Sequence, residues 1–299
     1  MSDKCPCCGA VATTSAGPYL ASESQRASLG ISLILACERC GLHFASPLPS
    51  QEALDRFYSS GEYWDKLAPP TSVQGVHAYS QSVERCAWAA ARIPVPPRQI
   101  ADIGAGQGWM ALAVGEVWRE QNLCYDFLEP DDKAAATIVQ LGMKPVRRRL
   151  DALPSQPEYD LIFLNQVLEH TVDPLPLLRA LSGGLKPGGH LYIEIPHRDD
   201  RFKDNFFPHM LFIDDAVLDR LCNFAGMEVL ALECFGHMPG KGCLFAKLLR
   251  AGFRVAASLG LRQIASVLDR KLWGYTPRAD GIWLRALVRK PNEVTSASS

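Results

Sequence analysis

Two periodicities of apolar residues divide most of the chain into predicted strands and predicted helices. Tyr159–Asn165 is a nearly continuous apolar run, which is the pattern of a strand buried on both faces. Apolar runs that predict strands recur at 100–103, 123–128, 144–147, 159–165, 190–195, 227–233 and 281–289. Helical patterns lie between most of these runs, as at Asp132–Leu141 and Asp214–Ala225. From about Arg98 onward, this alternation predicts an α/β fold with a Rossmann-like, seven-stranded, mostly parallel sheet and helices on both of its faces.

The segment that precedes this alternation has a helical pattern. A helix is expected to begin after Ser50, because serine caps helices well, and a longer helix is expected from about Gln74 to Arg92. The cluster Pro94-Val95-Pro96-Pro97 ends that helix and marks the entrance to the main domain. The expected regions are a small N-terminal module at 1–48, a helical linker or cap at 49–97, a main domain at 98–290 and a disordered tail at 291–299.

One segment between the last two predicted strands does not fit the alternation. Lys241–Trp273 carries seven basic residues and a single acid, Asp269, and its apolar residues recur at roughly helical spacing. This pattern predicts one or two basic amphipathic helices within an insertion at 241–275 of the main domain. Such helices could form a lid or a dimer contact with a solvated polar face. Alternatively, they could contact an anionic membrane surface, or a phosphate-bearing or lipid-linked substrate.

Three glycines at alternate positions connect the first strand of the main domain to the helix that follows. The segment Ile100–Met110 reads I-A-D-I-G-A-G-Q-G-W-M. Its glycines, Gly104, Gly106 and Gly108, suit a tight turn because glycine tolerates positive φ and lets a ligand lie against bare backbone. Strand, glycine turn and helix form the first unit of a nucleotide-binding βαβ layer. A dinucleotide fingerprint would place its third glycine at position 109, where this chain has Trp109.

Two matching C-x-x-C-G pairs lie near the N-terminus, Cys5 with Cys8 and Cys37 with Cys40. Two intervening residues allow both thiolates of a pair to face one point, and the glycine turns the backbone around it. Two such pairs supply the four soft ligands of a closed tetrahedral zinc site, and such a zinc ion is structural. The alternatives are a redox C-x-x-C or free core thiols, but a redox motif would not need a second matching pair. Cys7 could substitute for a neighbour or stay free. Between the two pairs, Leu29–Ala36 is predicted to be a strand, so the N-terminal module is expected to be zinc-ribbon-like.

Composition and charge narrow the function classes. The chain has 299 residues, of which 47% are hydrophobic and 21% charged, and a formal net charge of −1. No overall electrostatic attraction to nucleic acid is therefore expected. No run of about eighteen uninterrupted apolar residues predicts a transmembrane helix. Because the N-terminus does not resemble a signal peptide, the ten cysteines do not favour a disulfide scaffold. We expect a cytoplasmic protein.

The glycine turn becomes more specific when it is considered with later segments. Its G-x-G-x-G form, with Glu129 closing the next strand, resembles motif I of the class I S-adenosylmethionine-dependent methyltransferases. Three further pieces follow in the matching order, namely Asp151-Ala152, Y-D-L-I-F-L-N-Q-V-L-E-H at Tyr159–His170, and G-L-K-P-G-G-H-L-Y-I-E-I-P at Gly184–Pro196. The L-K-P-G-G stretch is expected to form a turn. The V-L-E-H and L-K-P-G-G stretches look like the small-molecule branch of that family. The resemblance covers about residues 98–290.

This resemblance implies S-adenosylmethionine as the cofactor and gives the glycine turn a role. The backbone of the turn would wrap the methionine portion of the cofactor. The residues of the turn that would do so are Gly104, Ala105, Gly106 and Gly108. Asp102, at the end of the preceding strand, would lie near the ammonium group of the cofactor.

The other parts of the cofactor are matched to later residues. Glu129 would accept hydrogen bonds from both ribose hydroxyls, which requires a carboxylate with two acceptor oxygens. Asp151 could accept a hydrogen bond from the adenine amino group, and Ala152 could donate one through its backbone. Asn165 and Gln166 lie at the carboxyl end of the fourth strand, where ligands bind in such sheets.

Methyl transfer needs little covalent chemistry from the protein, because the sulfonium is already activated and alignment supplies much of the rate. If the acceptor is a hydroxyl or an acidic carbon, a histidine base would help. His197, which follows the fifth strand, is the first candidate, and His170 and His209 are the next, although each could instead be structural. In quinone-biosynthesis O-methyltransferases of this family, E-x-x-E-H after the fourth strand binds magnesium. Here Gln166 replaces the first acid, which argues against a catalytic divalent ion.

The sequence therefore predicts methyl transfer to a small-molecule acceptor. The paired cysteine motifs and the C-G-L-H-F-A-S-P segment resemble a zinc-carrying subset often linked to sugar or glycan modification, so a sugar, glycan or related metabolite is expected. An rRNA base methyltransferase is one alternative, since some carry zinc knuckles, but the chain lacks an N-P-P-Y-type motif. Trp109 and L-K-P-G-G disfavour an NAD(P)-dependent oxidoreductase. The intact glycine loop and Glu129 disfavour a non-catalytic zinc-containing binding protein.

Overall fold

The computed structural model describes residues 4–11, 13–60, 67–69, 72–118, 123–140, 146–237 and 243–292. Parts of the predicted segments lie outside these ranges. They are 1–3 and 12 of the N-terminal module, 61–66 and 70–71 of the linker, 119–122, 141–145 and 238–242 of the main domain, and 293–299 of the tail. The positions in the main domain include Leu141 of a predicted helix, 144–145 of the third strand and 241–242 of the insertion.

An eight-stranded sheet in the order β11-β10-β12-β8-β7-β4-β5-β6 forms the centre of the molecule. Its strands are β4 (Gln99–Ile103), β5 (Cys124–Leu128), β6 (Val146–Arg149), β7 (Tyr159–Asn165), β8 (Leu185–Pro196), β10 (Glu228–His237), β11 (Tyr275–Pro277) and β12 (Trp283–Arg289). The five adjacent strands β8-β7-β4-β5-β6 are parallel to one another. In contrast, β12 is antiparallel to both of its neighbours, β8 and β10. Seven strands correspond to those predicted, and the short β11 extends one edge. The predicted Rossmann-like α/β fold is confirmed.

The register of the parallel strands brings three strand ends to one edge of the sheet. Ile103 at the end of β4 pairs with Leu128 at the end of β5, and it also pairs with Leu164 near the end of β7. The glycine turn, the residue after β5 and the last residue of β7 therefore lie side by side. This alignment positions the candidate site.

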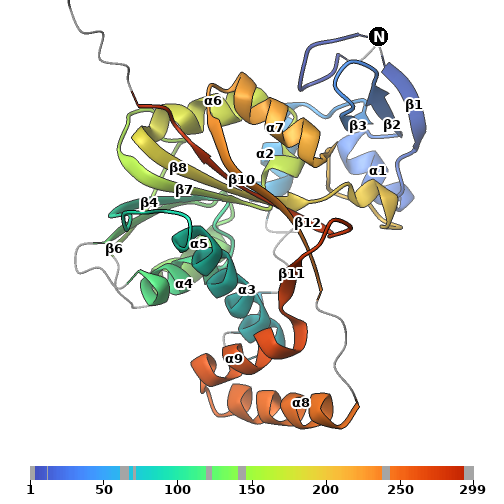
Figure 1. Ribbon diagram of the computed structural model, residues 1–299. Helices are drawn as coiled ribbons and strands as arrows, with labels where there is room; N and C mark the ends of the chain where they lie inside the picture. The colour runs from blue at the N-terminus through green and yellow to red at the C-terminus, as the bar shows by residue number, and fades with distance from the viewer. Residues whose placement is uncertain are drawn as a thin grey trace, which may run out of the picture.

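Helices cover both faces of the sheet (Figure 1). On one face lie α3 (Val73–Ala90), α4 (Trp109–Val117) and α5 (Asp132–Gln140), and on the other α6 (Pro174–Gly184) and α7 (Asp215–Phe224). A core of buried apolar side chains fills each interface between sheet and helices. Ser50 caps α2 (Gln51–Ser59), as predicted, because its Oγ accepts the Ala53 N–H at 3.2 Å.

The N-terminal segment folds into a second, antiparallel sheet that a strand of the main domain completes. The strands of this sheet, in spatial order, are β1 (Thr13–Pro18), β2 (Leu33–Cys37), β3 (His43–Ser46) and β9 (Leu211–Phe212). Buried residues of the module join the core under α6 and α7. The Tyr19 hydroxyl donates to the His209 carbonyl at 2.9 Å, and His43 Nδ1 lies 2.9 Å from Asp200 Oδ2. The module and the main domain therefore share one core.

Two element boundaries differ from the sequence prediction. A strand was predicted at Leu29–Ala36, but Glu23–Leu29 forms helix α1. Ser22 and Gln25 form a capping box at its start, and Gly30, with φ 70°, ends it, so local capping determines the structure there. The L-K-P-G-G segment was predicted as a turn. It instead belongs to β8, where a register shift against β7 accommodates it.

The basic insertion forms a helical hairpin that packs against α3 (Figure 1), as its amphipathic pattern predicted. Its helices are α8 (Cys243–Ser258) and α9 (Arg262–Trp273). Phe253 and Ala265 form a small core with α3, and His77 Nδ1 of α3 lies 3.0 Å from Asp269 Oδ2 of α9. Among the helices described, none combines the length and the apolar character that crossing a membrane requires.

Candidate active site

A cavity of about 800 Å³ opens at the carboxyl ends of β4, β5 and β7. This edge is where ligands bind in open parallel sheets. The predicted site residues that line it are Asp102, Gly104, Ala105, Gly106, Glu129, Asn165, Gln166 and His170. The structure therefore brings most of the predicted cofactor residues to one place.

The turn after β4 presents backbone to this cavity. Gly104, Gly106 and Gly108 have φ angles of 75°, 53° and 81°, in the left-handed region that favours glycine. A Cβ atom on Gly104 would lie only 2.4 Å from Val167 Cγ2, so a larger residue would not fit. The Gly104 N–H donates to the Leu128 carbonyl at 2.8 Å and ties the turn to the end of β5. Gly108 is the N-cap of α4 and lies behind the lining residues.

Glu129 is buried directly after β5 and faces the glycine turn. Its Oε2 accepts the Gly106 N–H at 2.7 Å, and its Oε1 accepts the Asp131 N–H at 3.0 Å. These two bonds fix the carboxylate at the cavity wall. A carboxylate offers about four acceptor positions, which is enough to bind ligand hydroxyls as well.

Asp102 is buried beneath the turn, near the end of β4. Burial raises the pKa of Asp102 to about 7, although the Tyr125 hydroxyl donates a hydrogen bond to its carboxylate. A ligand ammonium group beside Asp102 would lower this pKa again, because an opposite charge favours the ionised form. The carboxyl group is therefore suited to a cationic ligand group.

Two amides at the end of β7 line the cavity. Asn165 Oδ1 is buried and accepts no hydrogen bond from the described residues. Because an unsatisfied buried acceptor costs about 1–3 kcal/mol, this oxygen indicates a donor group on a ligand. Gln166 has φ 57°, which is uncommon for a residue other than glycine, and its Nε2 lies 3.5 Å from Glu194 Oε1.

Asp151 and Ala152 are not among the residues that line this cavity. They line a separate hollow of about 310 Å³ beyond β6, and only their neighbour Leu153 reaches the main cavity. β6 ends at Arg149, whose Nη2 donates to the Glu129 carbonyl at 2.8 Å, so the following loop starts beside the cavity wall and turns outward. The order of the motifs predicted a loop after the third strand, and such a loop follows β6. It did not predict which way the side chains of Asp151 and Ala152 point. A role in adenine binding stays a prediction.

The structure also corrects the placement of His197, the first candidate for the base. His197 follows β8 but lines a second hollow, of about 540 Å³, together with Arg201 and Glu233. Its backbone N–H donates to the Ile282 carbonyl, and its Nδ1 lies 3.0 Å from the Gly281 carbonyl oxygen. Because these bonds hold the ring beside the segment that leads into β12, His197 is not placed to act on a ligand in the main cavity.

The other two candidate histidines lie together, and one of them, His170, lines the main cavity. His170 ends the short 3₁₀ helix η1 (Leu168–His170) after β7, and its ring centroid is 4.7 Å from that of His209. Burial lowers the pKa of His170 to about 3, so this imidazole is neutral at physiological pH. The adjacent Glu169 is also buried, and burial raises its pKa to about 8. The V-L-E-H motif indicated Glu169 and His170, but their contact with His209 depends on the tertiary fold.

Helices of the predicted linker contribute cavity residues that the sequence pattern missed. α2 provides Leu54, Asp55 and Tyr58, and α3 provides Arg85. Arg85 is buried, and its Nε donates to Glu194 Oε1 at 2.7 Å. The amphipathic pattern predicted a cap here. It did not show which residues of these helices would face the cavity.

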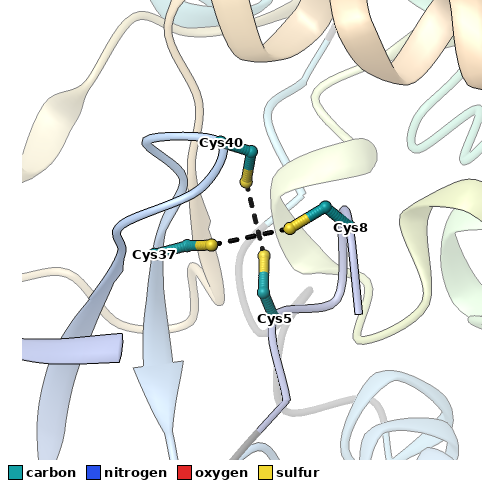
Figure 2. Close-up of side chains that lie close together, drawn as sticks. All are labelled: Cys5, Cys8, Cys37 and Cys40. Atoms are coloured by element: carbon teal, nitrogen blue, oxygen red, sulfur yellow. Dashed lines mark hydrogen bonds between the residues drawn. The ribbon is translucent and has the colours of Figure 1, made fainter. Parts of the chain in front are cut away.

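The four predicted zinc ligands converge on one point in the N-terminal module (Figure 2), and they are Cys5, Cys8, Cys37 and Cys40. Two pairs of Sγ atoms are 3.5 Å apart, and all four sulfurs lie within 4.8 Å of one another. Zn–S bonds of about 2.3 Å in a tetrahedron place sulfurs roughly 3.8 Å apart. Gly9 and Gly41, with φ 69° and 80°, turn the backbone after each pair. The geometry is compatible with a zinc module.

Comparison with known proteins relates the chain to methyltransferases. Residues 74–251, more than half of the chain, match a family model described as a methyltransferase domain. A ubiquinone biosynthesis O-methyltransferase of Xanthomonas campestris pv. campestris is 28% identical over 156 residues, which are 50% of this chain and 62% of that protein. A trans-aconitate 2-methyltransferase of Rhodopseudomonas palustris is 29% identical over 124 residues, which are 37% and 43% of the two chains. The chain therefore spans less than two thirds of the length of these relatives.

A solved structure supports the same fold. A chain in the complex between the Haloferax volcanii Trm112 methyltransferase activator and a methyltransferase superposes with a TM-score of 0.50 at 15% identity. The superposition covers 75% of this chain and 96% of the other. At this identity the likeness concerns the fold alone.

Proposed function

The chain belongs to the class I S-adenosylmethionine-dependent methyltransferase family, and on this premise we propose that its acceptor is a small molecule of the sugar, glycan or related metabolite class. The observation that carries the enzymatic assignment is the cavity at the strand ends, where the glycine turn meets Glu129. The identity of the acceptor is a separate question, and it depends on the outer part of the same cavity.

The cavity residues fit the cofactor of this family. The bare backbone at Gly104 and Gly106 admits the methionine portion, and Asp102 is placed for its ammonium group. Glu129 is held where it can accept two ribose hydroxyls, and Asn165 Oδ1 offers a buried acceptor to a donor group. When bound, the cofactor supplies an activated methyl group on a sulfonium. The contribution of the protein is to hold donor and acceptor in line and to exclude water.

Polar groups that line the cavity outside the predicted cofactor residues support a hydroxyl-rich acceptor. Asp55 of α2 and Asp173 before α6 both line the cavity, and Thr171 lies between Asp173 and His170. Carboxylates accept hydrogen bonds from several neighbouring hydroxyls, and Tyr58 provides an aromatic surface against which a sugar ring can pack. Together with the zinc-ribbon-like module, these residues favour a sugar or glycan over a purely apolar metabolite.

A quinone-type aromatic acceptor is the second candidate. Apolar side chains also line the cavity, among them Leu54, Val167 and Leu177. Several relatives are named ubiquinone biosynthesis O-methyltransferases. A flat aromatic acceptor would contact these side chains rather than the carboxylates of Asp55 and Asp173.

The four-cysteine cluster supports a structural zinc ion in the N-terminal module. Four protein ligands would leave no coordination position for a substrate, so the ion would stabilise the module and take no part in methyl transfer. Cys7 is buried in the same module but is not part of this cluster.

The helical hairpin of α8 and α9 supports contact with an anionic membrane surface. Its outer apolar residues are exposed by 44–66%, and they are Leu248, Val255, Leu259, Ile264 and Val267. From Lys247 to Trp273 there are six basic residues and one acid, Asp269, whose carboxylate faces His77. Exposed apolar side chains flanked by basic residues complement a membrane with anionic headgroups. The whole chain has a net charge of −1, so the excess of basic residues is a property of this hairpin rather than of the whole chain. A lipid-linked acceptor would fit this surface.

The function is tested in two steps. Calorimetry should give binding of S-adenosylmethionine and none of NAD, and binding of neither would support a non-catalytic scaffold. Transfer of a labelled methyl group is then measured with nucleotide sugars, lipid-linked glycans, catechol-type quinone precursors and rRNA. We expect label in a sugar or glycan. Label only in a quinone precursor or in rRNA would overturn the proposed acceptor class while leaving the methyltransferase assignment intact.

A further inference from the structure

We propose that Glu169, His170 and His209 form a binding site for a divalent transition-metal ion, such as Zn²⁺, beside the main cavity, which His170 lines. One ligand atom from each residue lies within 4.8 Å of the others. The three residues come from two separate segments, the 3₁₀ helix after β7 and the segment before β9. The site is distinct from the four-cysteine cluster of the N-terminal module.

In the described part of the chain, the buried carboxyl group of Glu169 lacks a partner, which a metal ion could supply by displacing its proton. Its residue is 1% exposed, and neither of its oxygens has a hydrogen-bond partner among the described residues. Glu169 Oε1 lies 3.8 Å from His170 Nε2, too far for a hydrogen bond but close enough for both atoms to bind one ion. Buried polar groups are normally partnered, because removing a charge from water without compensation is costly.

The two imidazoles have the outer partners that metal-binding histidines require. His209 Nδ1 lies 2.6 Å from Asp199 Oδ2, and Lys203 Nζ contacts the same carboxylate oxygen at 2.8 Å. His170 Nδ1 lies 3.4 Å from the Pro208 carbonyl oxygen. Each Nδ1 is therefore assigned the proton, since it faces an acceptor, and each Nε2 carries the lone pair that can bind a metal. A carboxylate or carbonyl behind a ligating histidine is the usual arrangement at such sites.

Backbone contacts hold the two segments in register. The Met210 N–H donates to the Glu169 carbonyl at 2.7 Å, and the His209 N–H donates to the Phe206 carbonyl at 2.7 Å. On the other side, the Tyr19 hydroxyl of the N-terminal module donates to the His209 carbonyl. The three ligand residues are therefore fixed by bonds that do not involve their ligand atoms.

Two imidazoles and one carboxylate favour zinc, iron(II) or manganese over magnesium, which prefers oxygen ligands. Gln166, which stands where the magnesium motif has its first acid, faces Glu194 and does not belong to the cluster. Three protein ligands leave a position open for a further oxygen, and His170 lines the cavity. That this position takes an oxygen of the acceptor rests on the proposed methyl transfer, whereas metal binding itself does not.

The test counts metal ions in the full chain. Wild-type protein and variants are loaded with excess Zn²⁺, desalted and assayed for metal equivalents by mass spectrometry. We expect Glu169→Gln and His209→Gln to hold one equivalent less than the wild type. The matched control is His197→Gln, which changes a histidine outside the cluster and should hold as much metal as the wild type. Equal metal content in all four proteins would overturn the proposal.

Cobalt provides a readout that does not depend on the variants folding. Titration of metal-free wild-type protein with Co²⁺ should bind two equivalents, of which only one develops the strong absorption of thiolate ligands. If every bound equivalent develops that absorption, the proposed site does not exist. Calorimetry with S-adenosylmethionine decides the proposed function separately, because cofactor binding and metal content are measured independently.

Discussion

Two buried carboxyl groups near the cavity differ in charge because their surroundings differ. Burial raises the pKa of Asp102 on β4 to about 7. Burial also opposes the ionisation of Glu194 on β8, but the guanidinium groups of Arg85 and Arg285 outweigh it and lower that pKa to about 2. Arg85 Nη2 lies 2.6 Å from the Glu194 carboxylate. The Glu194 carboxylate therefore keeps its charge behind Arg85, which lines the cavity, whereas the charge of Asp102 can respond to a ligand.

The raised pKa of Asp102 predicts a specific pH dependence of stability. In the unfolded chain Asp102 loses its proton near its ordinary value of 3.8, and in the folded protein only near 7. Between these two pH values the folded state therefore binds more protons than the unfolded state, and this difference stabilises the fold. The stabilisation from Asp102 is complete below about pH 4, and it is lost as the pH rises to 7. The loss is at most on the order of 4 kcal/mol.

Asn cannot ionise, so Asp102→Asn should not show this loss. Urea denaturation at several pH values from 4.5 to 7.5 should find the variant gaining stability relative to the wild type as the pH rises. Asp204→Asn, which changes an exposed acid, serves as the control and should keep a nearly constant difference from the wild type. A constant difference for Asp102→Asn as well would contradict the assigned pKa.

Glu129 provides a test of cofactor recognition. Glu129→Gln keeps the size of the side chain but removes one acceptor oxygen and the charge. Hydrogen bonds to a charged group contribute about 1.5–3 kcal/mol each, so the affinity for S-adenosylmethionine should fall at least about tenfold. Calorimetry measures the dissociation constant, and Glu228→Gln, at an exposed carboxylate paired with Arg289, is the matched control. Unchanged affinity in Glu129→Gln would remove Glu129 from the cofactor site.

At the scale of elements, the hairpin of α8 and α9 carries the prediction about membranes. Wild-type protein should sediment with vesicles containing an anionic phospholipid, and binding should weaken as salt screens the basic residues. The double substitution Leu248→Asp and Leu259→Asp should reduce binding tenfold or more, because each exposed leucine contributes roughly 1.5–3 kcal/mol when buried.

Val95→Asp is the matched control for this experiment, since Val95 is 73% exposed but lies before β4, outside the hairpin. Equal sedimentation with neutral and anionic vesicles, or none with either, would refute the membrane contact. Concentration-dependent dimers of the wild type that the double substitution abolishes would instead identify the hairpin as a dimer contact.

The elements also differ in how far the sequence predicted them. Strand β7 was predicted to the residue, because a long apolar run between turns has one plausible structure. The glycine turn and Glu129 were placed correctly at the strand ends, since their positions follow from local order along the chain. His197 was misplaced for the opposite reason. Its surroundings depend on the pairing of β8 with β12, which is distant in sequence. The contact between His170 and His209 depends on long-range pairing in the same way.

At the scale of the whole molecule, the zinc-ribbon-like module and the main domain depend on each other through β3 and β9. His43 pairs with Phe212, and the Ala45 N–H donates to the Met210 carbonyl at 2.7 Å. The same segment carries His209. The module therefore supports the segment whose His209 packs against His170, a residue that lines the cavity.

Loss of the zinc ligands should consequently loosen a distant part of the main domain. Cys37→Ser should release one metal equivalent and increase hydrogen exchange at Ala45 and Met210 by tenfold or more, equal to about 1.4 kcal/mol of local stability. Hydrogen–deuterium exchange read by mass spectrometry measures this effect. Amides of α9, which packs against α3, serve as the internal control and should not change. If hydrogen exchange at Met210 is unchanged in Cys37→Ser, the module and the segment before β9 are energetically independent.

The shared sheet has a consequence for how the chain acquires its structure during synthesis. The ribosome releases the cysteine pairs and β1, β2 and β3 before any part of the main domain, and β9 follows only after the chain has been made through Phe212. Until then the open edge of β3 has no partner strand, and unpaired edges are sites of aggregation. Because β9 reaches β3 only after strands β4 to β8 of the main sheet have been made, the N-terminal module leaves the ribosome long before its sheet can be completed.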